Sequence, residues 1–159
     1  MAKVYRNGAI GALMDEYERA AGELISLLQT LSQETYVAVL DAATPDPDCR
    51  SVQSIMNHVV RAGYGYSNYI RKQYSDPFTE RKETYDVQTP DLAIAAMHEM
   101  LAYTLDMMQN KWDLSFEEIL KNVIDTNWKQ RYDFDQLMEH AIVHILRHRR
   151  QIERLLSKN

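Results

Sequence analysis

Four long segments of the chain repeat apolar residues at the three- and four-residue spacing of an amphipathic α-helix. They span about residues 9–31, 51–76, 90–112 and 134–156. Ser51 and the pair Thr89-Pro90 stand where helix-capping residues and a first-turn proline are favoured. No stretch alternates apolar and polar residues with a period of two, so no strand is predicted. These features predict an all-α fold, a four-helix bundle, formed by a single domain over residues 1–159.

The connections between these segments carry weaker signals. Short accessory helices are predicted after Ser32, to residue 40, and after Ser115, to residue 124. Residues 41–50 are predicted to form a loop, 77–88 a polar connection and 125–133 an irregular segment. Gly63 and Gly65 lie within the second long helix, where glycine is unfavourable. They could permit close packing or give access to a ligand, and the sequence alone leaves both open.

Composition excludes several classes of function. A single cysteine, Cys49, rules out an internal disulfide and a Cys-rich zinc site. The formal net charge of −5 disfavours a nucleic-acid partner. No window approaches the roughly 18 apolar residues that span a bilayer, and the N-terminus has no signal-peptide pattern. We therefore expect a cytoplasmic protein without a membrane or nucleic-acid partner.

Three histidines follow one another at four-residue intervals in the last helical segment: His140, His144 and His148. Imidazoles at this spacing lie on adjacent turns of one helix face and can bind one metal ion together. At about 100° per residue, His148 falls near the centre of the apolar face and His144 towards its edge. His140 falls further out, towards the rim of the bundle.

A third ligand is available on the second long helix, where His58 lies at the edge of the apolar face. Three imidazoles with a fourth position left to solvent form an open site for Zn²⁺ or a similar divalent ion. His98 also lies near an apolar edge, so spacing alone does not exclude it. The alternative is structural, because histidines and arginines near a helix C-terminus are favoured by the helix dipole.

The sequence HAIVHILRHRRQIERLL resembles the C-terminal signature of the DinB/YfiT-like superfamily. There a His-x-x-x-His pair is followed by Arg, a small residue, Gln and an apolar residue, and SVQSIMNHVVRA matches the histidine of the second helix. The resemblance covers nearly the whole chain. It implies a four-helix bundle, often a homodimer, that binds Zn, Ni or a similar metal through His58, His144 and His148. This chain departs from the pattern in the bulky Arg150 and the additional His140.

Four residues are candidates for supporting or substrate contacts around such a site: Arg149, Gln151, Tyr69 and His140. Carboxylates of the first helix, Asp15, Glu16 and Glu18, are further candidates. The arginines between 147 and 154 suggest either an anion-binding patch or, as we favour, a solvated helix end. Ile142, Val143 and Leu146 form an apolar strip outside the main face, which predicts homodimerisation.

Two functions follow from these observations. The first is an enzyme, a metal-dependent hydrolase or a thiol-dependent transferase, as the family resemblance implies, acting on a small molecule whose identity the sequence does not give. The second is a non-enzymatic metal-binding or stress-response bundle whose histidine site is structural or vestigial. A pocket beside an open coordination position distinguishes the first from the second.

Overall fold

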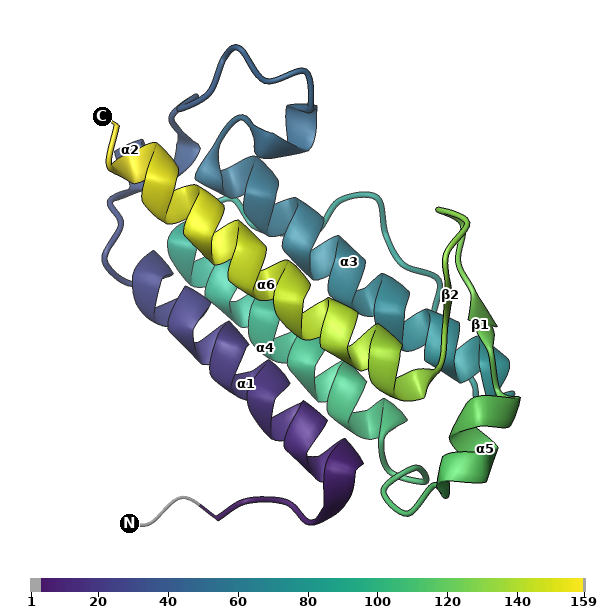
Figure 1. The fold of residues 1–159 in the computed structure, drawn as a ribbon. Coiled ribbons are helices and arrows are strands. Elements are labelled where there is room, and N and C mark those ends of the chain that lie inside the picture. The colour runs from purple at the N-terminus through teal and green to yellow at the C-terminus, as the bar shows by residue number, and fades with distance from the viewer. Residues whose placement is uncertain (1–3, 159) are drawn as a thin grey trace.

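Four long helices, α1 (Gly8–Leu28), α3 (Val52–Gln73), α4 (Pro90–Met107) and α6 (Phe134–Leu156), lie side by side in the computed structural model, which describes residues 4–158 (Figure 1). Helices α1 and α3 each contact both α4 and α6, so the four form a closed bundle. Buried side chains from all four fill its interior. The prediction of an all-α bundle is confirmed.

Shorter elements connect these helices: α2 (Gln33–Val37), the 3₁₀ turn η1 (Pro47–Cys49) and α5 (Phe116–Lys121). The helices predicted after Ser32 and Ser115 are therefore present, although both are shorter than expected. Helix α4 ends five residues before the predicted boundary at residue 112. No helix among residues 4–158 is long and apolar enough to cross a membrane.

Capping interactions fix the first turns of α3 and α6. The Ser51 hydroxyl accepts a hydrogen bond from the Ser54 amide, and the Ser54 hydroxyl accepts one from the Ser51 amide. Asp133 and Gln136 form the same reciprocal pair at the start of α6. Each cap contributes about 1 kcal/mol and sets the residue at which its helix begins. Each cap thereby fixes the direction of the side chains along its own helix.

The segment before α6 differs from the prediction of an irregular connection without strands. β1 (Ile124–Asp125) pairs antiparallel with β2 (Arg131–Tyr132), and Ile124 lies opposite Tyr132. The Thr126 amide donates to the Gln130 carbonyl at 3.0 Å, which closes the turn. Strands of two residues are too short to produce a period-two pattern, which explains why the sequence did not reveal this hairpin.

The apolar strip of α6 divides between core and surface. Ile142 and Leu146 are half-buried and pack against the core, whereas Val143 is 49% exposed. Homodimerisation through this strip stays a prediction.

The two glycines of α3 have different surroundings. A Cβ at Gly63 would lie 2.8 Å from Cγ of Met100 and 3.1 Å from the Tyr17 hydroxyl, so this glycine permits close contact with α4 and α1. At Gly65 the nearest atom is Nη1 of Arg81, at 3.4 Å, which is ordinary van der Waals contact. Gly63 therefore serves packing, whereas Gly65 lies on the side of α3 that faces Arg81.

We expect Gly63→Ala to lower the free energy of unfolding by about 1–2 kcal/mol, because overpacking costs more than the helix propensity gained. Gly22→Ala is the matched control, since Gly22 lies within α1 with nothing within 4 Å of the added Cβ. It should stabilise the protein by about 0.5–1 kcal/mol. Urea denaturation of both variants measures these changes, and equal effects of the two substitutions would contradict the role of Gly63 in packing.

Candidate metal centre

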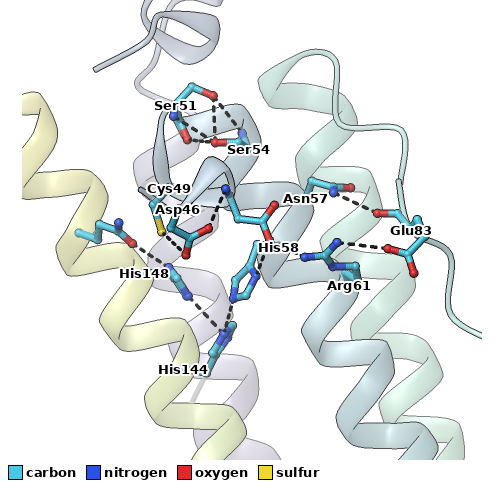
Figure 2. A network of polar contacts seen from close by, with 12 residues as sticks. Asp46, Cys49, Ser51, Ser54, Asn57, His58, Arg61, Glu83, His144 and His148 are labelled. Carbon is cyan, nitrogen blue, oxygen red and sulfur yellow. Dashed lines mark hydrogen bonds and ion pairs between the residues drawn. The ribbon is translucent and has the colours of Figure 1, made fainter. Parts of the chain in front are cut away.

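Three imidazoles from two adjacent helices meet at one point of the α3–α6 contact (Figure 2). Nε2 of His144 lies 3.0 Å from Nε2 of His58 and 3.2 Å from Nε2 of His148. All three ligand atoms lie within 4.8 Å of one another. The structure thus brings together the three histidines that the sequence singled out as ligands.

Hydrogen bonds on the outer side of two rings orient them toward this point. Nδ1 of His58 lies 3.3 Å from Oδ2 of Asp48, and Nδ1 of His148 lies 2.9 Å from Oε1 of Gln151. Because carboxylate and amide oxygens can only accept, Nδ1 carries the proton in both rings. The Nε2 lone pairs of His58 and His148 are then directed at His144.

This arrangement leaves a polar contact unsatisfied. The single proton that Nε2 of His144 can carry is donated to His58 or to His148, so at least one of their two Nε2 lone pairs is left without a donor. A cation at the centre would satisfy all three nitrogens. Nitrogens about 2.0–2.1 Å from a tetrahedral Zn²⁺ lie about 3.3–3.4 Å apart, close to the two distances observed. The residues present therefore fit a divalent metal ion.

Burial keeps the imidazoles of His144 and His148 neutral, which is the form that binds metals. His144 is only 6% exposed, and burial, followed by the proximity of His148 and His58, lowers its pKa to about 2. Burial also lowers the pKa of His148, opposed by its hydrogen bond to Gln151. At neutral pH the buried rings thus offer lone pairs rather than positive charges.

Helical phase had placed His148 nearest the centre of the buried face, but His144 occupies that position. His144 is buried and His148 is half-buried. The prediction used the apolar residues of α6 alone and took no account of where α3 packs. His58 and Tyr66 of α3 cover His144, and this contact buries it.

Asp48 is a site residue that the sequence analysis did not find. It lies in η1, where the Asp46 carboxylate accepts a hydrogen bond from the Asp48 amide at 3.0 Å. Its own carboxylate contacts both His58 and Arg61, and Arg61 in turn lies 3.5 Å from Glu83. The predicted loop 41–50 thus holds the carboxylate that orients His58. The Asp-Pro-Asp sequence around Pro47 was the only available signal, and it indicated a turn.

The other candidate residues lie at different distances from the histidines. Gln151 contacts His148 directly, as described above. Arg149 forms an ion pair with Glu23 of α1, and the Tyr69 hydroxyl accepts a hydrogen bond from the Asn127 amide. Neither Arg149 nor Tyr69 contacts the three histidines.

Two further histidines lie outside the cluster. The His140 ring packs against Tyr66, Trp128 and Tyr132, and its Nδ1 lies 3.3 Å from the Tyr132 hydroxyl. His98 is exposed on α4. The α1 carboxylates are also engaged elsewhere, since Asp15 and Glu18 bind Arg6 and Glu16 binds Arg19.

Comparison with known proteins agrees with this geometry. The chain matches the model of the DinB family over residues 4–158. No match to a curated protein or to a solved structure was found. The family resemblance inferred from the histidine motif is therefore confirmed.

We expect the metal-free protein to lose stability as the pH falls from 6.5 to 5. The pKa of His144 is about 2 in the fold against 6.5 for an ordinary histidine, so only the unfolded chain gains this proton in that range. The loss should reach about 1.4 kcal/mol per pH unit for His144 alone. Urea denaturation with a chelator, at several pH values, measures it.

His144→Gln should flatten this pH dependence, because glutamine does not titrate. His98→Gln, at an exposed site, is the control and should leave the dependence unchanged. An equal acid response in wild type and His144→Gln would show that His144 is not held neutral by the fold.

Proposed function

Because this chain belongs to the DinB family, we propose that His58, His144 and His148 bind one divalent metal ion and that the protein uses it on a small molecule. The reaction we infer is a metal-dependent hydrolysis or the transfer of a thiol. Imidazole ligands favour Zn²⁺ or Ni²⁺ among the common divalent ions.

The observation that carries this proposal is the direction of the histidine lone pairs. Asp48 and Gln151 hold the Nδ1 protons of His58 and His148, so both Nε2 atoms are aimed at the same point as Nε2 of His144. A purely structural cluster of histidines gains nothing from nitrogens that face each other without protons. A metal site requires this arrangement.

An open coordination position favours an enzyme over a structural site. Among residues 4–158, no fourth His, Cys, Asp or Glu joins the cluster, and the His58 side chain is 29% exposed. Structural zinc sites are usually closed by four protein ligands, whereas catalytic sites have three and an exchangeable position. A metal bound here would lower the pKa of a water or thiol in that position.

Metal analysis tests the ligand assignment. After reconstitution with Zn²⁺ or Ni²⁺ and dialysis, the wild type should retain about one ion per chain. The variants His58→Ala, His144→Ala and His148→Ala should each retain far less. His140→Ala is the matched control on α6 and should retain metal as the wild type does. Equal metal content in wild type and His144→Ala would refute the assignment.

In the same measurement, Asp48→Ala should retain less metal than the wild type but more than the three histidine variants. Removing the partner of a metal-binding histidine typically weakens metal affinity about tenfold to hundredfold, because the ring loses its fixed orientation. Asp86→Ala removes the same charge from an exposed position in the 77–88 connection and controls for electrostatics.

Cobalt substitution tests the open position and separates the two proposed reactions. Adding a low-molecular-weight thiol to the Co²⁺ protein should produce a sulfur-to-cobalt charge-transfer band if the site accepts thiols. A cobalt spectrum that changes with pH but not with added thiol would favour hydrolysis. A spectrum that responds to neither would favour the non-enzymatic alternative.

A further inference from the structure

Arg61 lies three residues after His58 on α3 and binds the same carboxylate oxygen as that histidine. Oδ2 of Asp48 accepts a hydrogen bond from Nη2 of Arg61 and lies 3.3 Å from Nδ1 of His58. Residues three apart on a helix lie on one face, so α3 provides both donors. The carboxylate of a short 3₁₀ turn is therefore held by two side chains of the helix that carries a proposed metal ligand.

A second acidic side chain contacts the other nitrogen of the guanidinium. Nη1 of Arg61 lies 3.5 Å from Oε2 of Glu83, in the connection between α3 and α4 (Figure 2). Asn57 of α3 fixes the backbone there, because its side chain donates to the Glu83 carbonyl at 3.3 Å and accepts from the Tyr85 amide at 2.9 Å. The guanidinium thus joins the turn that carries Asp48 to the connection that carries Glu83.

The contact with Arg61 limits the directions in which the Asp48 carboxylate can point. The Asp48 amide is fixed by the Asp46 carboxylate at 3.0 Å, but that contact leaves the Asp48 side chain free to turn about its own bonds. The side chain is 31% exposed, so water competes for its oxygens. A charged donor restricts this rotation, because charged hydrogen bonds are about twice as strong as neutral ones. The direction of the His58 ring then depends on Arg61.

We propose that Arg61 is a positioning residue of the metal centre. By holding Asp48, it keeps the proton of His58 on Nδ1 and the Nε2 lone pair directed at the metal ion. This inference rests on the proposed function, because it assigns a role within the same site. Arg61 acts through Asp48 and His58 and is not itself a ligand, since a guanidinium has no lone pair to donate.

The positive charge of Arg61 has the opposite effect on metal binding. A guanidinium repels a divalent cation and offsets part of the negative charge with which Asp48 attracts one. Solvent screens this repulsion, since the Arg61 side chain is 22% exposed, and it changes the affinity by about fivefold or less. Loss of an outer partner of a metal-binding histidine costs about tenfold to hundredfold. Positioning therefore outweighs repulsion, and the sign of the change in affinity separates the two effects.

Competition of the full-length protein with a chromophoric zinc chelator measures the zinc affinity that tests this proposal. Arg61→Gln should weaken zinc binding about tenfold, at the low end of that range because Arg61 acts through Asp48. Arg61→Lys should recover part of the loss, because lysine keeps one charged donor but not the planar fork. Glu83→Gln should have little effect, since the Glu83 side chain is largely exposed.

Arg147→Gln is the matched control, because it removes the same charge from an exposed position of α6. After burial and the neighbouring His148 and His58, the charge of Arg147 lowers the pKa of His144, so this arginine acts on the same cluster. In the described part of the chain no acidic side chain pairs with Arg147, so its loss should leave zinc affinity unchanged or raise it. Equal weakening by Arg61→Gln and Arg147→Gln would overturn the inference.

The tautomer of His58 provides a readout that a general loss of stability does not change. NMR spectra of the histidine ring nitrogens, recorded on the zinc-free protein, should show the His58 proton on Nδ1 in the wild type. Arg61→Gln should show a mixture of the two tautomers. A variant whose His58 keeps its proton on Nδ1, or which binds zinc as tightly as the wild type, would refute the role of Arg61.

The same measurements separate this inference from the proposed function. If the wild type binds no zinc but Arg61→Gln still changes the tautomer of His58, the proposed function is refuted and the positioning of His58 by Arg61 stands. If the wild type binds zinc and Arg61→Gln binds it equally well, the metal centre stands and the positioning role is refuted.

Discussion

The contact between α3 and α6 determines whether this protein has a site at all. A shift of one residue along an α-helix moves a side chain about 1.5 Å along the axis and turns it about 100°. Either helix displaced by one residue would separate the nitrogens that now lie 3.0 and 3.2 Å apart. The reciprocal caps at Ser51 and Asp133 fix where α3 and α6 begin, and the packing at Gly63 holds α3 against α4 and α1. Geometry at the histidines therefore depends on interactions several turns away.

Sequence periodicity predicted the long helices and, on α3 and α6, the three histidines of the site. It did not predict the contribution of the loop that carries Asp48. Histidines on one helix, such as His144 and His148, are related by fixed spacing, and His58 could be chosen because its helical phase directed it inward. Asp48 could not be found in this way, because a loop has no periodicity that reports where its side chains point. The predicted order of burial, with His148 deeper than His144, was wrong for a related reason. Neighbouring helices determine which part of the apolar face of α6 is covered.

The two departures from the family signature have different consequences. Arg150 replaces a small residue, but it is exposed on α6, so its bulk reaches solvent without displacing the core. The extra histidine, His140, joins an aromatic cluster with Tyr66, Trp128 and Tyr132. This cluster connects the hairpin between β1 and β2 to α6, and so places Trp128 beside His140 and Tyr66.

Charges of both signs act on the histidine cluster, and they have opposite effects on a cation bound there. Asp48 contacts His58, and the negative charge of Asp46 opposes the burial that lowers the pKa of His148. The positive charge of Arg147 adds to the lowering of the pKa of His144, after burial and the neighbouring His148 and His58. The carboxylates therefore favour a cation at the histidines, whereas Arg147 disfavours it. In a chain whose formal net charge is −5, this local arrangement of charges is a stronger guide to the ligand than the overall composition.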